Sequence, residues 1–206
     1  MSLPFFEGSS SLLELKTSFV AFRQDAMWLR HCYNMYHSLY ESGSENDGLL
    51  RASAEVFFYN LSNILVEYII LQIAKLTDPA TSKVQGITRD NLTVAHLNAE
   101  LKKNKLMSPE ICSISKKLMQ YRNLIVSVRN KLIAHSDKAT RLDGNPIGVH
   151  TPEEVSRFFS DLQKYCDTVG KQIGADPSDF SVQAGQGDVS DLLSALKRSN
   201  KALGES

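Results

Sequence analysis

Residues 108–137 read SPEICSISKKLMQYRNLIVSVRNKLIAHSD, and this stretch decides the fold class. Its apolar residues recur at alternating intervals of three and four over about 25 residues, which is the spacing of one face of an α-helix. That face consists of Ile111, Ile114, Leu118, Tyr121, Ile125, Val128 and Leu132. Ser108 suits the N-cap, Pro109 the first helical position, and Glu110 the positive end of a helix. We therefore predict one long amphipathic helix that begins at Ser108.

Segments on both sides of this helix show the same periodicity. We expect further long helices at residues 11–40, 49–76 and 151–173, and shorter ones at 93–103 and 188–203. Thr151, Pro152 and Glu154 form a start signal of the capping-box type. No stretch predicts a strand hairpin. The pattern thus predicts an all-α, up-and-down helical bundle with an extra C-terminal helix.

The division of the chain follows from where the apolar residues thin out. We expect the bundle domain over residues 1–173, a linker over 174–187, and a short C-terminal helix and tail over 188–206. The most apolar stretch, residues 56–76, is interrupted by polar residues that include Asn60, Asn63 and Glu67. A membrane span needs about 20 mostly apolar residues. We therefore interpret this stretch as a buried central helix.

Composition limits the class of protein. The 206 residues carry 23 basic and 23 acidic side chains, and the 11 glycines and 6 prolines are few, which favours long helices over a many-stranded fold. Three widely spaced cysteines predict reduced thiols in a cytoplasmic protein, and the lack of a C-x-x-C pair argues against a structural zinc site. We expect no metal, no cofactor and no membrane partner.

Positive charge is concentrated in residues 101–141. This segment holds ten lysines and arginines against two acids, Glu110 and Asp137, so it carries a formal charge of 10 − 2 = +8 while the remainder carries −8. A local basic patch is typical of a phosphate-binding surface. The alternative is a solvated helix face whose charge is balanced by acids on neighbouring helices.

Two side chains in this segment suit RNA cleavage. His135 continues the apolar face three residues past Leu132, and Arg129 lies seven residues after Arg122 on a neighbouring stripe. An imidazole can move a proton at neutral pH, and a guanidinium can hold a phosphate. Together they suit attack of an RNA 2′-hydroxyl on its own phosphodiester, which needs no metal. The alternative is a histidine that only complements the helix dipole.

These residues carry a family resemblance. The run Arg129-Asn130-Lys131-Leu132-Ile133-Ala134-His135 resembles the signature of the HEPN superfamily (higher eukaryotes and prokaryotes nucleotide-binding), an arginine followed by a polar residue and then a histidine. Residues 74–80, 90–93 and 134–137 resemble the abortive-infection U branch of that superfamily. The resemblance covers about residues 10–170 and agrees with the predicted helical bundle.

The resemblance implies a site and a function. It assigns Arg129 and His135 as the catalytic pair, with Asn130 and Asp137 as supporting residues. Such proteins are similar in forming homodimers that build one RNA cleft, and many act as toxins or antiphage effectors with a cognate antitoxin. A tyrosine that related toxins carry two residues after the histidine is replaced here by Asp137.

We expect a few cations near this pair to bind RNA backbone phosphates: Arg122, Lys131 and Lys138. Two other functions remain open for the same fold. One is a non-catalytic nucleotide- or protein-binding module, and the other is a purely structural helical dimer. Two interpretations also stay open for the polar stripe of Asn60, Asn63 and Glu67. The stripe either faces the solvent or supports Arg122 or Arg129 through hydrogen bonds.

Overall fold

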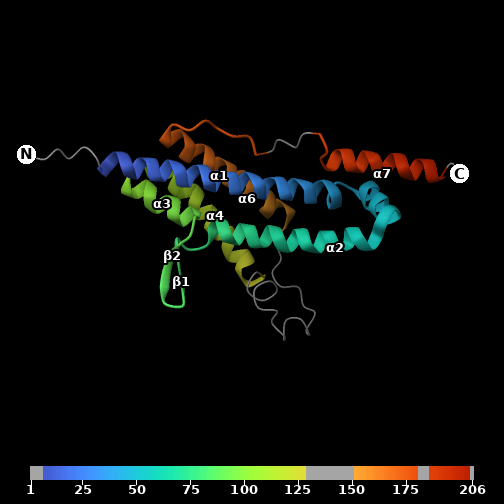
Figure 1. The fold of residues 1–206 in the computed structure, drawn as a ribbon, viewed down its shortest axis with the longest axis horizontal. Coiled ribbons are helices and arrows are strands. Elements are labelled where there is room, and N and C mark those ends of the chain that lie inside the picture. Colours follow the sequence, from blue (N-terminus) through green and yellow to red (C-terminus); the bar gives the residue numbers. More distant parts are fainter. Residues whose placement is uncertain (1–6, 129–150, 181–185, 205–206) are drawn as a thin grey trace, which may run out of the picture. The chain divides into compact units, whose positions relative to one another are not determined.

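The computed structural model describes residues 7–128, 151–180 and 186–204, and within these ranges the fold is all-α with one small hairpin (Figure 1). The elements in chain order are α1 (Glu7–Tyr40), α2 (Ser44–Thr77), β1 (Thr81–Val84), β2 (Ile87–Asp90), α3 (Val94–Lys103), α4 (Pro109–Val128), α6 (Pro152–Ile173) and α7 (Val189–Gly204). Each predicted helix is found, and the described ends lie within about five residues of the expected ones; the predicted continuation of α4 past Val128 lies outside the described residues. The prediction of an all-α bundle with an additional C-terminal helix is confirmed.

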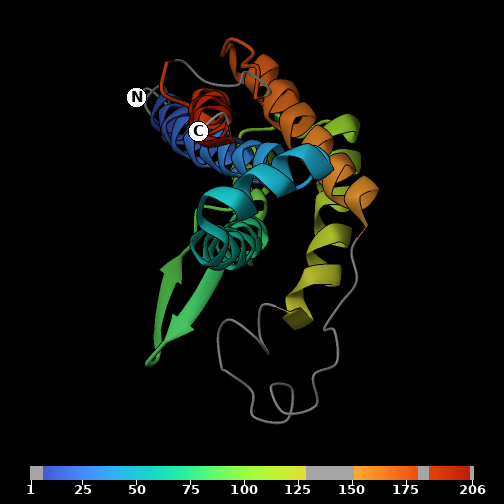
Figure 2. The same cartoon turned by 90° about the vertical axis from the view of Figure 1, so that its right-hand side faces the viewer.

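The prediction that no stretch forms a strand hairpin is wrong. Strands β1 and β2 pair antiparallel, with Val84 opposite Ile87, and Figure 2 shows the hairpin extending away from the helices beside it in the chain. The two turn residues, Gln85 and Gly86, both have positive φ (52° and 81°), which is the conformation of a tight two-residue hairpin turn. Each strand has only four residues and lacks strong apolar alternation, so its sequence signal is weak.

The described chain divides into two compact units: Met1–Met27 with Leu71–Asp179, and Trp28–Ile70 with Phe180–Ser206. In the first unit, α6 is the central helix. Its Tyr165 lies against Phe22 of α1 with ring centroids 6.1 Å apart, and the tyrosine hydroxyl donates a 3.0 Å hydrogen bond to Asn98 Oδ1 of α3. Phe158 of α6 stacks on Tyr121 of α4 at 4.7 Å. One buried face of α6 thus contacts three other helices.

Both ends of α6 follow the sequence signals. Thr151 Oγ1 accepts a 3.2 Å hydrogen bond from the Glu154 amide, and Glu154 Oε2 accepts a 2.8 Å bond from the Thr151 amide, which confirms the capping box. Gly174 ends the helix with φ 72°, a left-handed conformation that glycine adopts without steric cost. Beyond it, Arg23 Nη1 donates a 2.7 Å bond to the Asp176 carbonyl, so the chain after α6 is held against α1.

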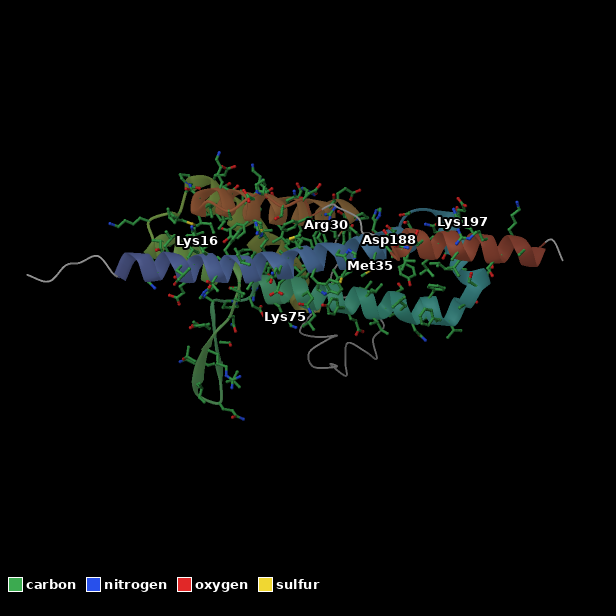
Figure 3. All side chains as sticks on the ribbon, turned by 45° about the horizontal axis from the view of Figure 1, so that its top comes forward. Lys16, Arg30, Met35, Lys75, Asp188 and Lys197 are labelled. Carbon is green, nitrogen blue, oxygen red and sulfur yellow. The ribbon has the colours of Figure 1, made fainter. Side chains whose placement is uncertain are left out.

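The second unit has a smaller core. Leu39 of α1 and Leu50 and Phe58 of α2 are buried together, and Val189, Leu193 and Leu196 of α7 pack against them. Tyr40 donates a 2.9 Å hydrogen bond to the Phe58 carbonyl. Lys197 of α7 pairs with Glu45 of α2 at 2.8 Å; Figure 3 labels this lysine. Within this unit, α7 therefore packs on α1 and α2 through apolar and charged contacts.

The prediction that residues 56–76 form a buried central helix is wrong for the first part of that stretch. Val56, Phe57 and Ile64 are 72%, 61% and 62% exposed, whereas most of the apolar residues from Ile69 to Leu76 are buried. Among the described residues, α2 is one helix that is long and apolar enough to cross a membrane by length and composition alone. Helical periodicity identifies the apolar side of a helix but not what covers it, which is why the sequence suggested burial.

Replacement of Thr151 tests the capping box. Thr151→Ala removes the side-chain acceptor for the Glu154 amide and is expected to lower the free energy of unfolding by about 1 kcal/mol. Urea denaturation followed by circular dichroism measures the change. Thr168→Ala is the matched control, because that exposed hydroxyl only bonds the Lys164 carbonyl within the helix. An equal loss in both variants would contradict a capping contribution.

Cys166 gives a pH-dependent prediction. Burial raises the pKa of its thiol far above the ordinary value, and the nearby Asp167 acts in the same direction. The unfolded thiol ionises near pH 9 while the folded one keeps its proton, so stability falls as pH rises above about 9. Between pH 8 and pH 10, wild type should lose about 1 to 2 kcal/mol more than Cys166→Ala. Urea unfolding at both pH values measures the difference, and equal losses would refute it.

Candidate nucleic-acid site at the end of α4

Most of the predicted site lies outside the described residues. Arg129, Asn130, Lys131, His135, Asp137 and Lys138 all fall within 129–150, so their mutual geometry stays a prediction. The described part of α4 ends at Val128, one residue before Arg129. The structure therefore describes the helix from which the predicted motif continues in sequence, together with one predicted site residue, Arg122.

Arg122 is held by an ion pair. Its Nη2 donates a 3.2 Å hydrogen bond to Asp78 Oδ1, and the two side chains are only 20% and 22% exposed. Asp78 directly follows the last residue of α2, Thr77, whose hydroxyl is buried and donates to the Ile73 carbonyl at 2.7 Å. The ion pair thus fixes the end of α2 to α4, seven residues before Arg129. The buried Nε of Arg122 has no partner among the described residues.

A groove of about 400 Å³ runs between α4 and α6. Its apolar wall comes from the stacked rings of Tyr121 and Phe158 and from Leu124, which is 43% exposed. Both acids and bases line it: Lys117, Glu154, Arg157 and Asp161. Sequence reasoning missed Arg157, Gln120 and Leu124. In the sequence, Leu124 is marked only as an additional apolar residue beside Ile125 of the predicted apolar face.

The described part of the basic segment is partly neutralised. Lys117 pairs with Asp161 at 3.7 Å, and Lys103 lies 4.0 Å from Glu14 and 3.8 Å from Glu100. With the Arg122–Asp78 pair, this is the arrangement that the solvated-face alternative predicts. Three other lysines are exposed and have no ion-pair partner in the part of the chain that the structure describes: Lys102, Lys105 and Lys116. These three remain available to a polyanion.

Comparison with known families decides what kind of domain this is. A model of the HEPN family AbiU2 matches residues 12–192, which is most of the chain. The chain belongs to the AbiU2 family of HEPN proteins. No curated protein and no solved structure matched it. The predicted membership of the HEPN superfamily, in its abortive-infection U branch, is confirmed.

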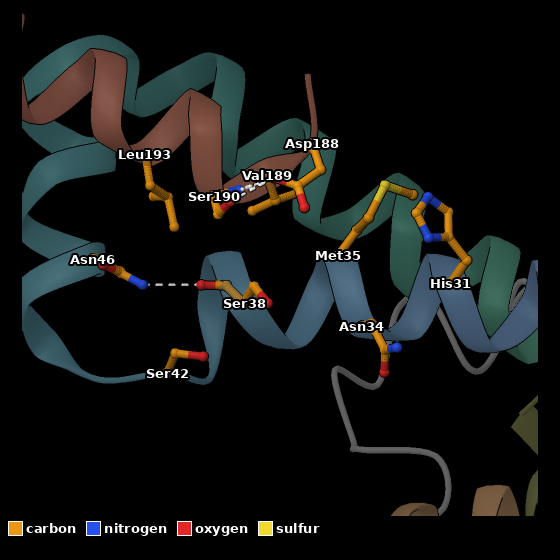
Figure 4. A pocket seen from close by; sticks show the side chains of 10 residues that line it. All are labelled: His31, Asn34, Met35, Ser38, Ser42, Asn46, Asp188, Val189, Ser190 and Leu193. Atoms are coloured by element: carbon orange, nitrogen blue, oxygen red, sulfur yellow. Dashed lines mark hydrogen bonds between the residues drawn. The ribbon is translucent and has the colours of Figure 1, made fainter. Parts of the chain in front are cut away.

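The AbiU2 match extends past α6 and reaches the first turn of α7. A second pocket, of about 170 Å³, lies there within the second unit (Figure 4). Several of its polar groups bond within the protein: Asn46 Nδ2 donates to the Ser38 carbonyl at 2.9 Å, and Asp188 Oδ1 accepts from the Ser190 amide at 2.8 Å. The buried Nδ2 of Asn34, also in the lining, has no partner among the described residues. The Ser190 hydroxyl bond is the main cause of a lowered pKa at Asp188. We interpret this pocket as a structural junction at the start of α7.

A double-mutant cycle tests the role of the ion pair in this HEPN domain. Arg122→Gln and Asp78→Asn should each destabilise the fold, with a coupling free energy of about 1 to 2 kcal/mol, because the pair is mostly shielded from water. Lys117→Gln and Asp161→Asn form the control cycle, since Lys117 is 58% exposed and such pairs contribute below about 1 kcal/mol. Equal coupling in the two cycles would contradict the structural role. Urea denaturation measures all variants.

Proposed function

We propose that this AbiU2-family chain is a metal-independent endoribonuclease of a toxin or antiphage defence system. The observation that carries the proposal is the HEPN family match across residues 12–192, which includes Arg129 and, six residues later, His135. The module itself, a HEPN-type helical domain, is established by that match. The reaction, the roles of the residues and the biological setting belong to the proposal.

The proposed reaction is an internal transesterification of RNA. The imidazole of His135 takes the proton of a 2′-hydroxyl, the 2′-oxygen attacks the adjacent phosphorus, and the bond from phosphorus to the 5′-oxygen breaks. A proton returns to the leaving 5′-oxygen, and the products are a 2′,3′-cyclic phosphate and a 5′-hydroxyl. The guanidinium of Arg129 stabilises negative charge on the phosphate oxygens, and Asn130 and Asp137 orient the pair.

We propose that Arg122, Lys131 and Lys138 bind backbone phosphates on either side of the cleaved bond. For Arg122, this means exchanging or sharing its contact with Asp78, because the pair occupies Nη2 in the free protein. The exposed Lys102, Lys105 and Lys116 extend the same basic segment toward α3 and along α4. We further propose that the protein works in the cytoplasm as a homodimer under control of a cognate antitoxin, with residues 1–173 as the catalytic module.

Active-site variants test the reaction. His135→Ala and Arg129→Ala should each lower the cleavage rate by at least about 100-fold in excess chelator, because each removes a group that acts in the transition state. His37→Ala and Arg198→Ala are matched controls on exposed positions and should cleave like wild type. The readout is a labelled RNA resolved on a denaturing gel, with circular dichroism to confirm that each variant is folded.

The same assay separates the competing functions. Wild-type cleavage by either site variant would refute the assignment of Arg129 and His135. Loss of cleavage on adding chelator, restored by a divalent cation, would refute metal independence. Salt-sensitive RNA binding without cut products would favour the non-catalytic binding module.

A further inference from the structure

One side of α2 leaves a row of apolar residues in contact with water. Phe57 and Ile64 are 61% and 62% exposed, and Leu61 and Tyr68 are half-buried. The covered side of Leu61 packs against the core of the second unit. Their spacing of four, three and four residues is the 3.5-residue repeat of helices that pack along a common seam. We call these four residues the α2 seam.

The seam lies on a straight part of the helix. Residue Ala54, with φ −165° and ψ 72°, interrupts the helical backbone three residues before Phe57, and no interruption is found from there to Thr77. The seam therefore spans about 16 Å along one helix axis. A straight partner helix of equal length can follow it without bending.

Further apolar surface of the second unit borders the seam. Trp28 of α1 is 53% exposed, and its indole Nε1 donates a 2.8 Å hydrogen bond to the Tyr68 hydroxyl. Val56, next to Phe57, is 72% exposed. Exposed aromatic and aliphatic side chains of this kind contribute roughly 100 Å² of accessible surface each. The α2 seam, together with Trp28, Val56 and the polar residues beside it, therefore offers an accessible surface of roughly 600 Å². Two such patches bury about 1,200 Å², the lower limit of a standard protein interface.

We propose that the α2 seam packs antiparallel against the α2 seam of a second copy of this chain. A two-fold interface requires a patch that is complementary to itself. In the antiparallel register centred between residues 62 and 63, Phe57 faces the partner's Tyr68, and Leu61 faces the partner's Ile64. Every seam residue then meets an apolar residue of the other copy, with Trp28 closing each end.

Polar residues beside the seam favour a protein partner over a lipid bilayer. Asn60, Asn63 and Glu67 form an exposed stripe along the same side of α2. A bilayer would desolvate this stripe, and a charged residue at the centre of a membrane costs about 2.5 to 3.5 kcal/mol or more. In the antiparallel pair the stripe lies at the rim, where the amides and the carboxylate keep their water.

The inference names the partner surface of the homodimer in the proposed function, but its test does not depend on cleavage. Phe57→Asp with Ile64→Asp introduces four carboxylates into the paired seams and should raise the dimer dissociation constant by at least about 100-fold. Leu13→Asp is the matched control, because Leu13 of α1 is 66% exposed and lies off the seam. Light scattering after gel filtration distinguishes the 23.0 kDa monomer from a dimer of twice that mass.

The single tryptophan reports the same event. Trp28 emission should shift to the red on dilution of wild type, be red-shifted at all concentrations in the double variant, and follow wild type in Leu13→Asp. Circular dichroism verifies that the variants keep their helices. A monomeric wild type, or a dimer that the double variant leaves intact, would overturn the proposal whether or not the protein cleaves RNA.

Cysteine cross-linking tests the antiparallel register. Phe57→Cys and Tyr68→Cys proteins should form a disulfide-linked dimer when mixed, at least about 10-fold more than either protein alone, with wild type as the background for Cys32, Cys112 and Cys166. Cross-linking of each variant only with itself would overturn the antiparallel register. Wild type that stays monomeric but sediments with vesicles of zwitterionic phospholipid would replace the second copy by a membrane.

Discussion

The burial of one face of α6 is the constraint on which the first unit depends. Val155, Phe158, Leu162, Tyr165 and Val169 are all nearly inaccessible to water, and they meet side chains from α1, α3 and α4. Burial of each large side chain is worth roughly 1.5 to 3 kcal/mol, far more than the surface ion pairs nearby. The Tyr121–Phe158 stack and the Arg122–Asp78 pair, at two adjacent residues, then hold the last part of α4 against α6 and the end of α2.

The sequence was sufficient for the helices and for most of the ends that the structure describes. Strict three-four spacing predicted α4 and α6, and Thr151 with Glu154 predicted the capping box, because both signals are local and need no knowledge of the rest of the chain. The hairpin was missed since four-residue strands carry almost no periodic signal. The burial of the first part of α2 was mispredicted for a different reason. The spacing of the apolar residues along a helix is the same whether the surface that covers them belongs to the same chain or to another.

The candidate site could be predicted only as a motif. Arg129 and His135 stand out because their chemistry and spacing match a known family, and the family match over residues 12–192 confirms the membership without describing their geometry. The pairing of Arg122 with Asp78, 44 residues earlier, was beyond sequence reasoning, since nothing local marks which acid a long arginine will reach. The +8 segment illustrates the same limit, because Asp161 and Glu14 come from distant helices to neutralise part of it.

The hairpin turn has a practical use. Nothing within 4 Å would meet a Cβ atom at Gly86, and the neighbouring strand residues Val84 and Ile87 are 46% and 60% exposed. The turn therefore lies outside both hydrophobic cores, and exposed loop tips are the sites where inserted residues are best tolerated. An epitope or a fluorophore-binding peptide placed between Gln85 and Gly86 would mark the protein in cells while leaving its termini, the α4 region and α2 unmodified.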